Sequence, residues 1–223
     1  MYDYFCDKIG SESLERLRVR DPDHAYSKAP SLLTRQLRLL AFDSLRANQI
    51  QRLSHEFLVT RVPGKIEGLN SEEDIRQLCR FGILHRVLDD PLAPGAVEFA
   101  HLSFQEFLAA KQLAIAISNG LTLGTFIKRC SISASSLRQV LTYYSFSDTS
   151  IPDRPFIATL WWQEYKASLD VERLYSLAAL LARISPRPEA LAAIYQGVKQ
   201  CLARLIDRSP VEVVEDKSDF QWG

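Results

Sequence analysis

The sequence lacks the features that mark several specialised classes of protein. Its 4 cysteines stand far apart, at positions 6, 79, 130 and 201, without a C-x-x-C pair. Isolated cysteines are typical of reduced thiols in a cytosolic protein and argue against a disulfide framework or a metal site. No apolar stretch reaches the roughly 18 residues of a membrane-spanning helix. The start, residues 1–5, has neither the basic region nor the apolar run of a secretory signal. We therefore expect a cytoplasmic chain without a membrane span.

An excess of charge of either sign is also missing. Lys plus Arg and Asp plus Glu each number 27, so the formal net charge is zero. No overall field therefore attracts the chain to nucleic acid or to an anionic membrane. The 47% hydrophobic and 24% charged fractions are ordinary for a globular protein, and 223 residues make one large domain or two small ones.

The chain has little glycine and no phosphate-binding loop. Its single Gly-Lys pair, Gly64-Lys65, is followed by Ile66 rather than Ser or Thr, and Val59 stands where the first glycine of the loop belongs. No acidic residue after an apolar strand supplies a magnesium ligand. The sequence predicts that this chain alone does not hydrolyse ATP.

Other catalytic arrangements are absent from the pattern. The histidines show no i, i+4 pair; they stand at positions 24, 55, 85 and 101. Ser103 lies close to His101 in the sequence, but no oxyanion-binding loop accompanies them. We expect no catalytic residue and no metal ligand, and hence no enzyme.

Helical periodicity is the dominant pattern that is present. Leucines at three- and four-residue spacing predict a helix over 31–47, and Asn70-Ser71 followed by three acidic residues predicts a capped helix. That helix is expected over 74–84, with Gly82 in a left-handed conformation near its end. Four more helices are predicted after Ser118, at 134–144, 156–169, 171–184 and 189–208. The pair Trp161-Trp162 in one of them is either core or a binding platform.

Residues 97–110 predict a short strand that runs into a helix. Val97, Phe99 and His101 alternate with other residues, which places His101 on the face of Phe99. Ser103 precedes Glu106 by three residues, the spacing of a capping box, in which each side chain would bond to the backbone amide of the other residue. His101 is then either a core histidine with satisfied hydrogen bonds or a polar group at a strand–helix junction, where phosphates often bind.

The same segment carries a resemblance to a known family. Residues 99–110 read F-A-H-L-S-F-Q-E-F-L-A-A. They resemble the signature F-x-H-x-[ST]-[FV]-Q-E-[FY]-[LF]-A-A at the end of the winged-helix domain in NACHT-type signal-transducing NTPases (STAND NTPases), which include the NOD-like receptors and bacterial relatives. The resemblance covers roughly residues 1–118. It implies a mainly α fold, in which a winged-helix domain with a small β-hairpin wing precedes an all-helical domain.

The resemblance also implies a division of the chain. Residues 1–30 would end a preceding helical domain, and 31–118 would form the winged-helix domain, with a wing hairpin made by 84–90 and 97–102. A helical domain over 119–211 and a flexible acidic tail over 212–223 would follow.

In that family the histidine of the signature contacts the terminal phosphate of bound ADP and holds a closed state. The resemblance therefore implies that His101 contacts a nucleotide phosphate. ADP or ATP, with magnesium, would be held by a nucleotide-binding domain of the same or a split protein, and no cofactor by this chain alone. We expect a regulatory and interaction fragment of a signalling or defence protein, which senses the nucleotide and controls self-oligomerisation.

Two other functions compete with this one. A free-standing helical adaptor would keep the fold without sensing nucleotide. A winged-helix regulator would read DNA with the helix before the wing. Residues 31–90 carry nine Lys or Arg against eight Asp or Glu, a net of +1, and Glu72-Glu73-Asp74 would point carboxylates at the duplex. The charge pattern argues against nucleic acid.

Overall fold

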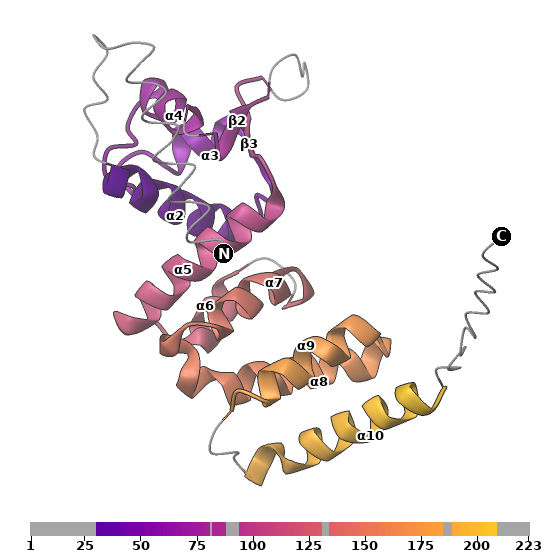
Figure 1. Cartoon of the computed structure of the whole chain (residues 1–223). Coiled ribbons are helices and arrows are strands. Elements are labelled where there is room, and N and C mark those ends of the chain that lie inside the picture. Colours follow the sequence, from indigo (N-terminus) through magenta and orange to yellow (C-terminus); the bar gives the residue numbers. More distant parts are fainter. Residues whose placement is uncertain (1–29, 81, 88–93, 131–133, 185–188, 209–223) are drawn as a thin grey trace, which may run out of the picture. The chain divides into compact units, whose positions relative to one another are not determined.

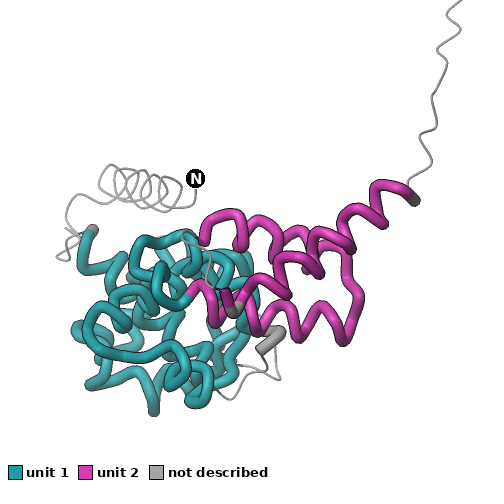
Figure 2. The backbone as a smooth tube through the Cα atoms, turned by 90° about the horizontal axis from the view of Figure 1, so that it is seen from below, with its two compact units in different colours: residues 1–153 teal, residues 154–223 magenta. Residues whose placement is uncertain are grey.

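The structure is a computed structural model, and it describes residues 30–80, 82–87, 94–130, 134–184 and 189–208 (Figure 1). The chain divides into two compact units, residues 1–153 and 154–223 (Figure 2), which are described separately. The described residues are mainly helical with one small antiparallel sheet, which confirms the predicted mainly α class. The predicted segments 1–30, except Pro30, and 212–223 lie outside the described residues.

The first unit combines helices with a three-stranded sheet. Its elements are α2 (Pro30–Arg46), β1 (Arg52–Leu53), α3 (His55–Thr60), α4 (Glu72–Cys79), β2 (Leu84–Arg86), β3 (Val97–Phe99), α5 (Leu102–Ser118), α6 (Leu123–Arg129), α7 (Ala134–Ser145) and the 3-10 helix η1 (Asp148–Asp153). The first predicted helix and the helix at 134–144 are confirmed as α2 and α7.

The sheet has β3 at its centre, in the order β1-β3-β2, with both pairings antiparallel. Pairing of Leu84 with Phe99 and of Arg86 with Val97 confirms the predicted antiparallel pairing of these two segments, although the strands are shorter than expected. β1 was not predicted, because two residues are too few to show an alternating pattern. Leu53 and Leu84 are buried together with both apolar residues of β3, so the sheet contributes one apolar face to the core.

The core of this unit forms around α5, which packs against α2 and against α7. Ala109 and Ala110 are buried, and their small side chains allow neighbouring helices to come close. Aromatic pairs add to the packing: Phe42 stacks on Phe126 with ring centroids 5.2 Å apart, and Phe107 meets Tyr143 edge-on at 5.7 Å. A helix with neighbours on two sides carries apolar residues around much of its circumference.

The start of α4 is fixed by a capping box, which confirms the predicted cap at the start of this helix. The Ser71 hydroxyl accepts from the Asp74 amide at 3.2 Å, and the Asp74 carboxylate accepts from the Ser71 amide at 3.0 Å. The helix ends at Cys79, so the predicted range 74–84 is wrong at both ends. Gly82, at φ 76, is left-handed as expected, and this conformation lets the chain turn into β2.

We expect Ser71→Ala to lower the free energy of unfolding of the first unit by about 1 kcal/mol, because the Asp74 amide loses its cap. Urea unfolding followed by circular dichroism measures the change. Ser118→Ala at the far end of α5 is a matched control, expected to change it by less than about 0.5 kcal/mol. Equal effects of the two substitutions would contradict the importance of this cap.

The second unit is helical throughout its described residues. It contains α8 (Arg154–Ser168), α9 (Val171–Leu181), the 3-10 helix η2 (Glu189–Leu191) and α10 (Ala192–Arg208). The three helices predicted in this region are confirmed, with their ends shifted by a few residues. Trp161 is buried and belongs to the core, whereas Trp162 is half-buried, stacks on Tyr165 and packs closely against Gly197.

The units divide after Asp153, whereas the sequence interpretation divided the domains after Ser118. Packing of α7 against α5 explains why the residues after Ser118 stay with the first unit. α6, which was not predicted, begins at a Thr122 cap within this stretch. In the described ranges, every helix is too short or too polar to cross a bilayer.

Candidate functional site

His101 is the N-cap of α5 and follows β3 by two residues. Its backbone is extended, with φ −151 and ψ 143. The ring nitrogen Nδ1 accepts from the Ser103 amide at 3.1 Å and lies 2.7 Å from the Ser103 hydroxyl. The predicted capping box of Ser103 and Glu106 is therefore wrong. The helix begins at Leu102, so the third helical position, which a capping-box partner occupies, is Phe104.

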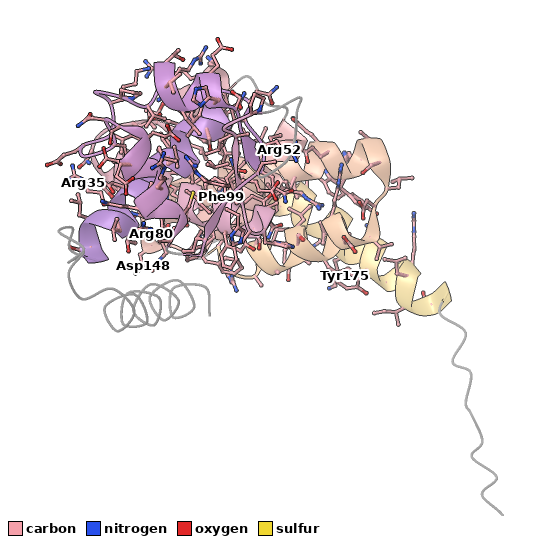
Figure 3. The ribbon with its side chains drawn as sticks, turned by 90° about the horizontal axis from the view of Figure 1, so that it is seen from above. Arg35, Arg52, Arg80, Phe99, Asp148 and Tyr175 are labelled. Atoms are coloured by element: carbon pink, nitrogen blue, oxygen red, sulfur yellow. The ribbon has the colours of Figure 1, made fainter. Side chains whose placement is uncertain are left out.

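The side chain of His101 is exposed, although that of Phe99 (labelled in Figure 3) is buried. The difference arises because the strand ends at Phe99. The Ala100 amide donates to the Ile83 carbonyl at 2.9 Å, and the chain then turns into α5. Strand alternation does not extend to His101, so the predictions of a shared face with Phe99 and of a core histidine are both wrong.

The hydrogen bond at Nδ1 determines which nitrogen carries the proton in the neutral ring. An acceptor at Nδ1 places the proton on Nε2. Nε2 has no hydrogen-bond partner among the described residues, so the exposed ring presents an N–H donor to solvent. His101 is thus a donor of fixed tautomer at a strand–helix junction.

Gln105 is the residue of this region that sequence reasoning missed. It is fully buried, and its amide nitrogen donates to the Ser44 hydroxyl at 2.8 Å and to the Gln49 carbonyl at 2.7 Å. Its amide oxygen accepts from the Gln51 backbone amide at 2.7 Å. These bonds fasten the first turn of α5 to α2 and to the connection before β1. The sequence did contain a signal for this role: Gln105 stands three and four residues before Leu108 and Ala109, which places it on the same apolar face of the helix.

Glu106 is half-buried and makes no hydrogen bond or ion pair with another described residue. Burial raises the pKa of its carboxyl from 4.5 to about 7, because the ionised form loses hydration. The carboxyl therefore titrates near neutral pH. It lies on α5 little more than one turn after His101.

The other described residues that were considered from the sequence do not join this site. His55 begins α3 and His85 lies in β2, both exposed, and His24 lies outside the described residues. Cys79 and Cys130 are free thiols whose pKa burial raises to about 11. No group of three or more His, Cys, Asp or Glu side chains in the described part of the chain is arranged to hold a metal ion.

Comparisons with protein-family models, curated proteins and solved structures found no match to this chain.

Proposed function

We propose that this chain is the regulatory and interaction region of a NACHT-type nucleotide switch. In this proposal His101 donates a hydrogen bond to the terminal phosphate of ADP held by a nucleotide-binding domain. The observation that carries the proposal is the exposed Nε2–H of His101, held in one tautomer by its own helix. The choice of ADP as the ligand rests on the resemblance of residues 99–110 to the family signature.

A winged-helix assignment for the first unit is part of this proposal. The order α2, β1, α3, α4, β2, β3 is the order of elements expected for such a domain. The central place of β3 between β1 and β2 supports it further. The wing would lie between β2 and β3, and α4 would be the helix before it.

Elementary electrostatics favours phosphate at His101. The Nε2–H is a donor when the ring is neutral, and protonation of the ring would add a positive charge. The N-terminus of α5 adds the partial positive charge of its helix dipole. A hydrogen bond to a charged group contributes about 1.5–3 kcal/mol. That difference would bias an equilibrium between closed and open states about 10- to 150-fold toward the ADP-bound state.

Rigid placement of the donor also supports the proposal. A donor contributes to binding only if it is held in the position that the phosphate requires. The hydrogen bond at Nδ1, on the opposite side of the ring from the Nε2–H donor, holds the ring in this way. Gln105 fastens the first turn of α5, and the Ser103 amide holds the imidazole ring.

We expect His101→Ala to reduce ADP retention about tenfold, since the phosphate loses one charge-assisted hydrogen bond. The measurement is the amount of ADP per chain, released by acid from the protein purified with its associated nucleotide-binding domain. His101→Gln keeps an amide donor and is expected to give an intermediate value. His85→Ala, an exposed histidine on β2, is the matched control.

Equal ADP retention by the wild type and His101→Ala would contradict nucleotide sensing and favour the helical adaptor. Loss of retention in His85→Ala to the same degree would show that the effect is not specific to His101.

The surface of α4 argues against the alternative function, DNA binding. Its basic residue Arg76 pairs with Glu72 and Glu73, each at 3.3 Å, and Arg86 of β2 also pairs with Glu72. Cations that are already paired with carboxylates are poor contacts for DNA phosphates. A salt titration of duplex binding tests this alternative; micromolar affinity with a steep salt slope would favour it.

A further inference from the structure

The second unit has an open apolar groove between α9 and α10, which we call the α9–α10 groove. Its volume is about 410 Å³. Leu181 of α9 and Val198 of α10 are buried at its floor, and Leu202 and Ile206 continue its apolar lining along α10. Ile206 is 72% exposed.

Exposure of apolar side chains extends beyond the lining. Tyr175, labelled in Figure 3, lies on α9 one turn before the groove residue Ala178 and is 58% exposed. Contiguous apolar surface of this kind marks a place where another segment packs. The spacing of Tyr195, Leu202 and Ile206 on α10 spans about 17 Å of helix, so an occupant would need several residues to cover it.

The groove also carries positive charge. Lys199 is part of its lining, and Arg204 is exposed on the same helix. Neither forms an ion pair with another residue in the described part of this unit. By sequence α10 contains three basic residues, Lys199, Arg204 and Arg208, against Asp207, a net of +2. An occupant with apolar residues and acidic flanks would complement both properties.

We propose that residues 209–223, which follow α10 directly in the sequence, bind in the α9–α10 groove. This segment has four acidic residues against Lys217, a net of −3. Its apolar residues are Val211, Val213, Val214, Phe220 and Trp222. Proline is unfavourable in a helix interior, so the sequence at Pro210 is compatible with the end of α10 at Arg208. Fifteen residues reach about 50 Å when extended, well beyond the length of the groove.

Tethering gives this occupant a large advantage over a free ligand. A short linker holds the segment at an effective concentration of about 1 mM, so even a weak contact keeps the groove filled. A partner with an acidic, apolar segment would have to displace residues 209–223 before it could bind. This binding is independent of any nucleotide contact at His101.

The test uses a fluorescein-labelled peptide of residues 209–223 and fluorescence polarisation. We expect the peptide to bind the chain truncated after Arg208 and to bind the intact chain at least about tenfold more weakly, because the tethered copy occupies the groove. Ile206→Asp in the truncated chain should weaken peptide binding at least about fivefold, because the exposed Ile206 can be replaced without disturbing the core. Lys199→Glu should weaken binding and reduce its dependence on salt.

Two matched controls keep the result interpretable. Ile151→Asp changes an exposed isoleucine in the first unit and should leave peptide affinity unchanged. A peptide with Phe220→Ala and Trp222→Ala should bind more weakly than the natural one. Circular dichroism verifies that every variant keeps its helical content.

Equal peptide binding by the intact and truncated chains would overturn the proposal. So would unchanged affinity in Ile206→Asp. Self-association of the truncated chain in sedimentation experiments, abolished by Ile206→Asp and indifferent to the peptide, would instead assign the groove to a second copy of the chain.

Discussion

Gln105→Leu is expected to lower the free energy of unfolding of the first unit by about 3 kcal/mol. Leucine is close to glutamine in size, but it offers no hydrogen bond. The Gln49 carbonyl and the Gln51 amide then lose a partner in a partly buried place. Each such unsatisfied group costs about 1–3 kcal/mol. Ser44 is affected less, because its hydroxyl still donates to the Ala41 carbonyl at 2.9 Å.

The backbone at Gln51 increases the effect. This residue has φ 59, a left-handed conformation that is unfavourable for a residue with a side chain. The bond from its amide to Gln105 helps to hold that conformation, which brings the chain from α2 into β1. We therefore expect Gln105→Leu also to loosen β1, which hydrogen exchange of the sheet amides would detect.

Urea unfolding of the wild type and Gln105→Leu measures the change in stability. Gln112→Leu is the matched control, because Gln112 lies on the same helix and makes no hydrogen bond with the described residues. Its effect is expected to stay below about 0.5 kcal/mol. A loss of less than about 1 kcal/mol in Gln105→Leu would show that water or local rearrangement satisfies the freed groups.

Local patterns predicted the parts of the fold that local forces determine. The spacing of leucines over 31–47 specified α2, and the Ser71 cap with its acidic first turn specified the start of α4. Both signals lie within a few residues of the structure that they predict. The hairpin of β2 and β3 was predictable for the same reason, since its strands are close in sequence.

The candidate site depended on contacts that no local pattern contains. Gln105 meets partners 54–61 residues earlier in the chain, so its role requires the tertiary fold. The position of His101 was predicted only as a strand–helix junction. Its exposure was missed, because the alternating pattern continues for two residues after the strand ends. Ser103 and Glu106 had the spacing of a capping box, but the N-cap is His101, two residues before Ser103.

Glu106→Gln is expected to stabilise the first unit at pH 8 by about 2 kcal/mol and to change little at pH 5. The carboxyl of Glu106 has a folded-state pKa of about 7, above its ordinary value of 4.5. Folding therefore favours the protonated form. The stability that this form contributes is fully present below pH 4.5 and is lost progressively as the pH rises to about 7 and above. Glutamine imitates the neutral form at every pH.

The expected size follows from the shift and from exposure. A full conversion of the pKa shift gives an upper bound of about 3 kcal/mol. Glu106 is only half-buried, so solvent screens its charge and reduces the expected effect to about 2 kcal/mol. Phe104, not Glu106, occupies the capping-box position, so the substitution removes no helix cap that would offset the gain.

Urea unfolding of the wild type and Glu106→Gln at several values between pH 5 and pH 8 provides the measurement. The difference between the two proteins isolates this carboxyl, because every other titratable group is common to both. Glu56→Gln, an exposed position on α3, is the matched control and should leave the pH dependence unchanged. A difference between wild type and Glu106→Gln that stays constant from pH 5 to pH 8 would exclude titration of Glu106 in this range.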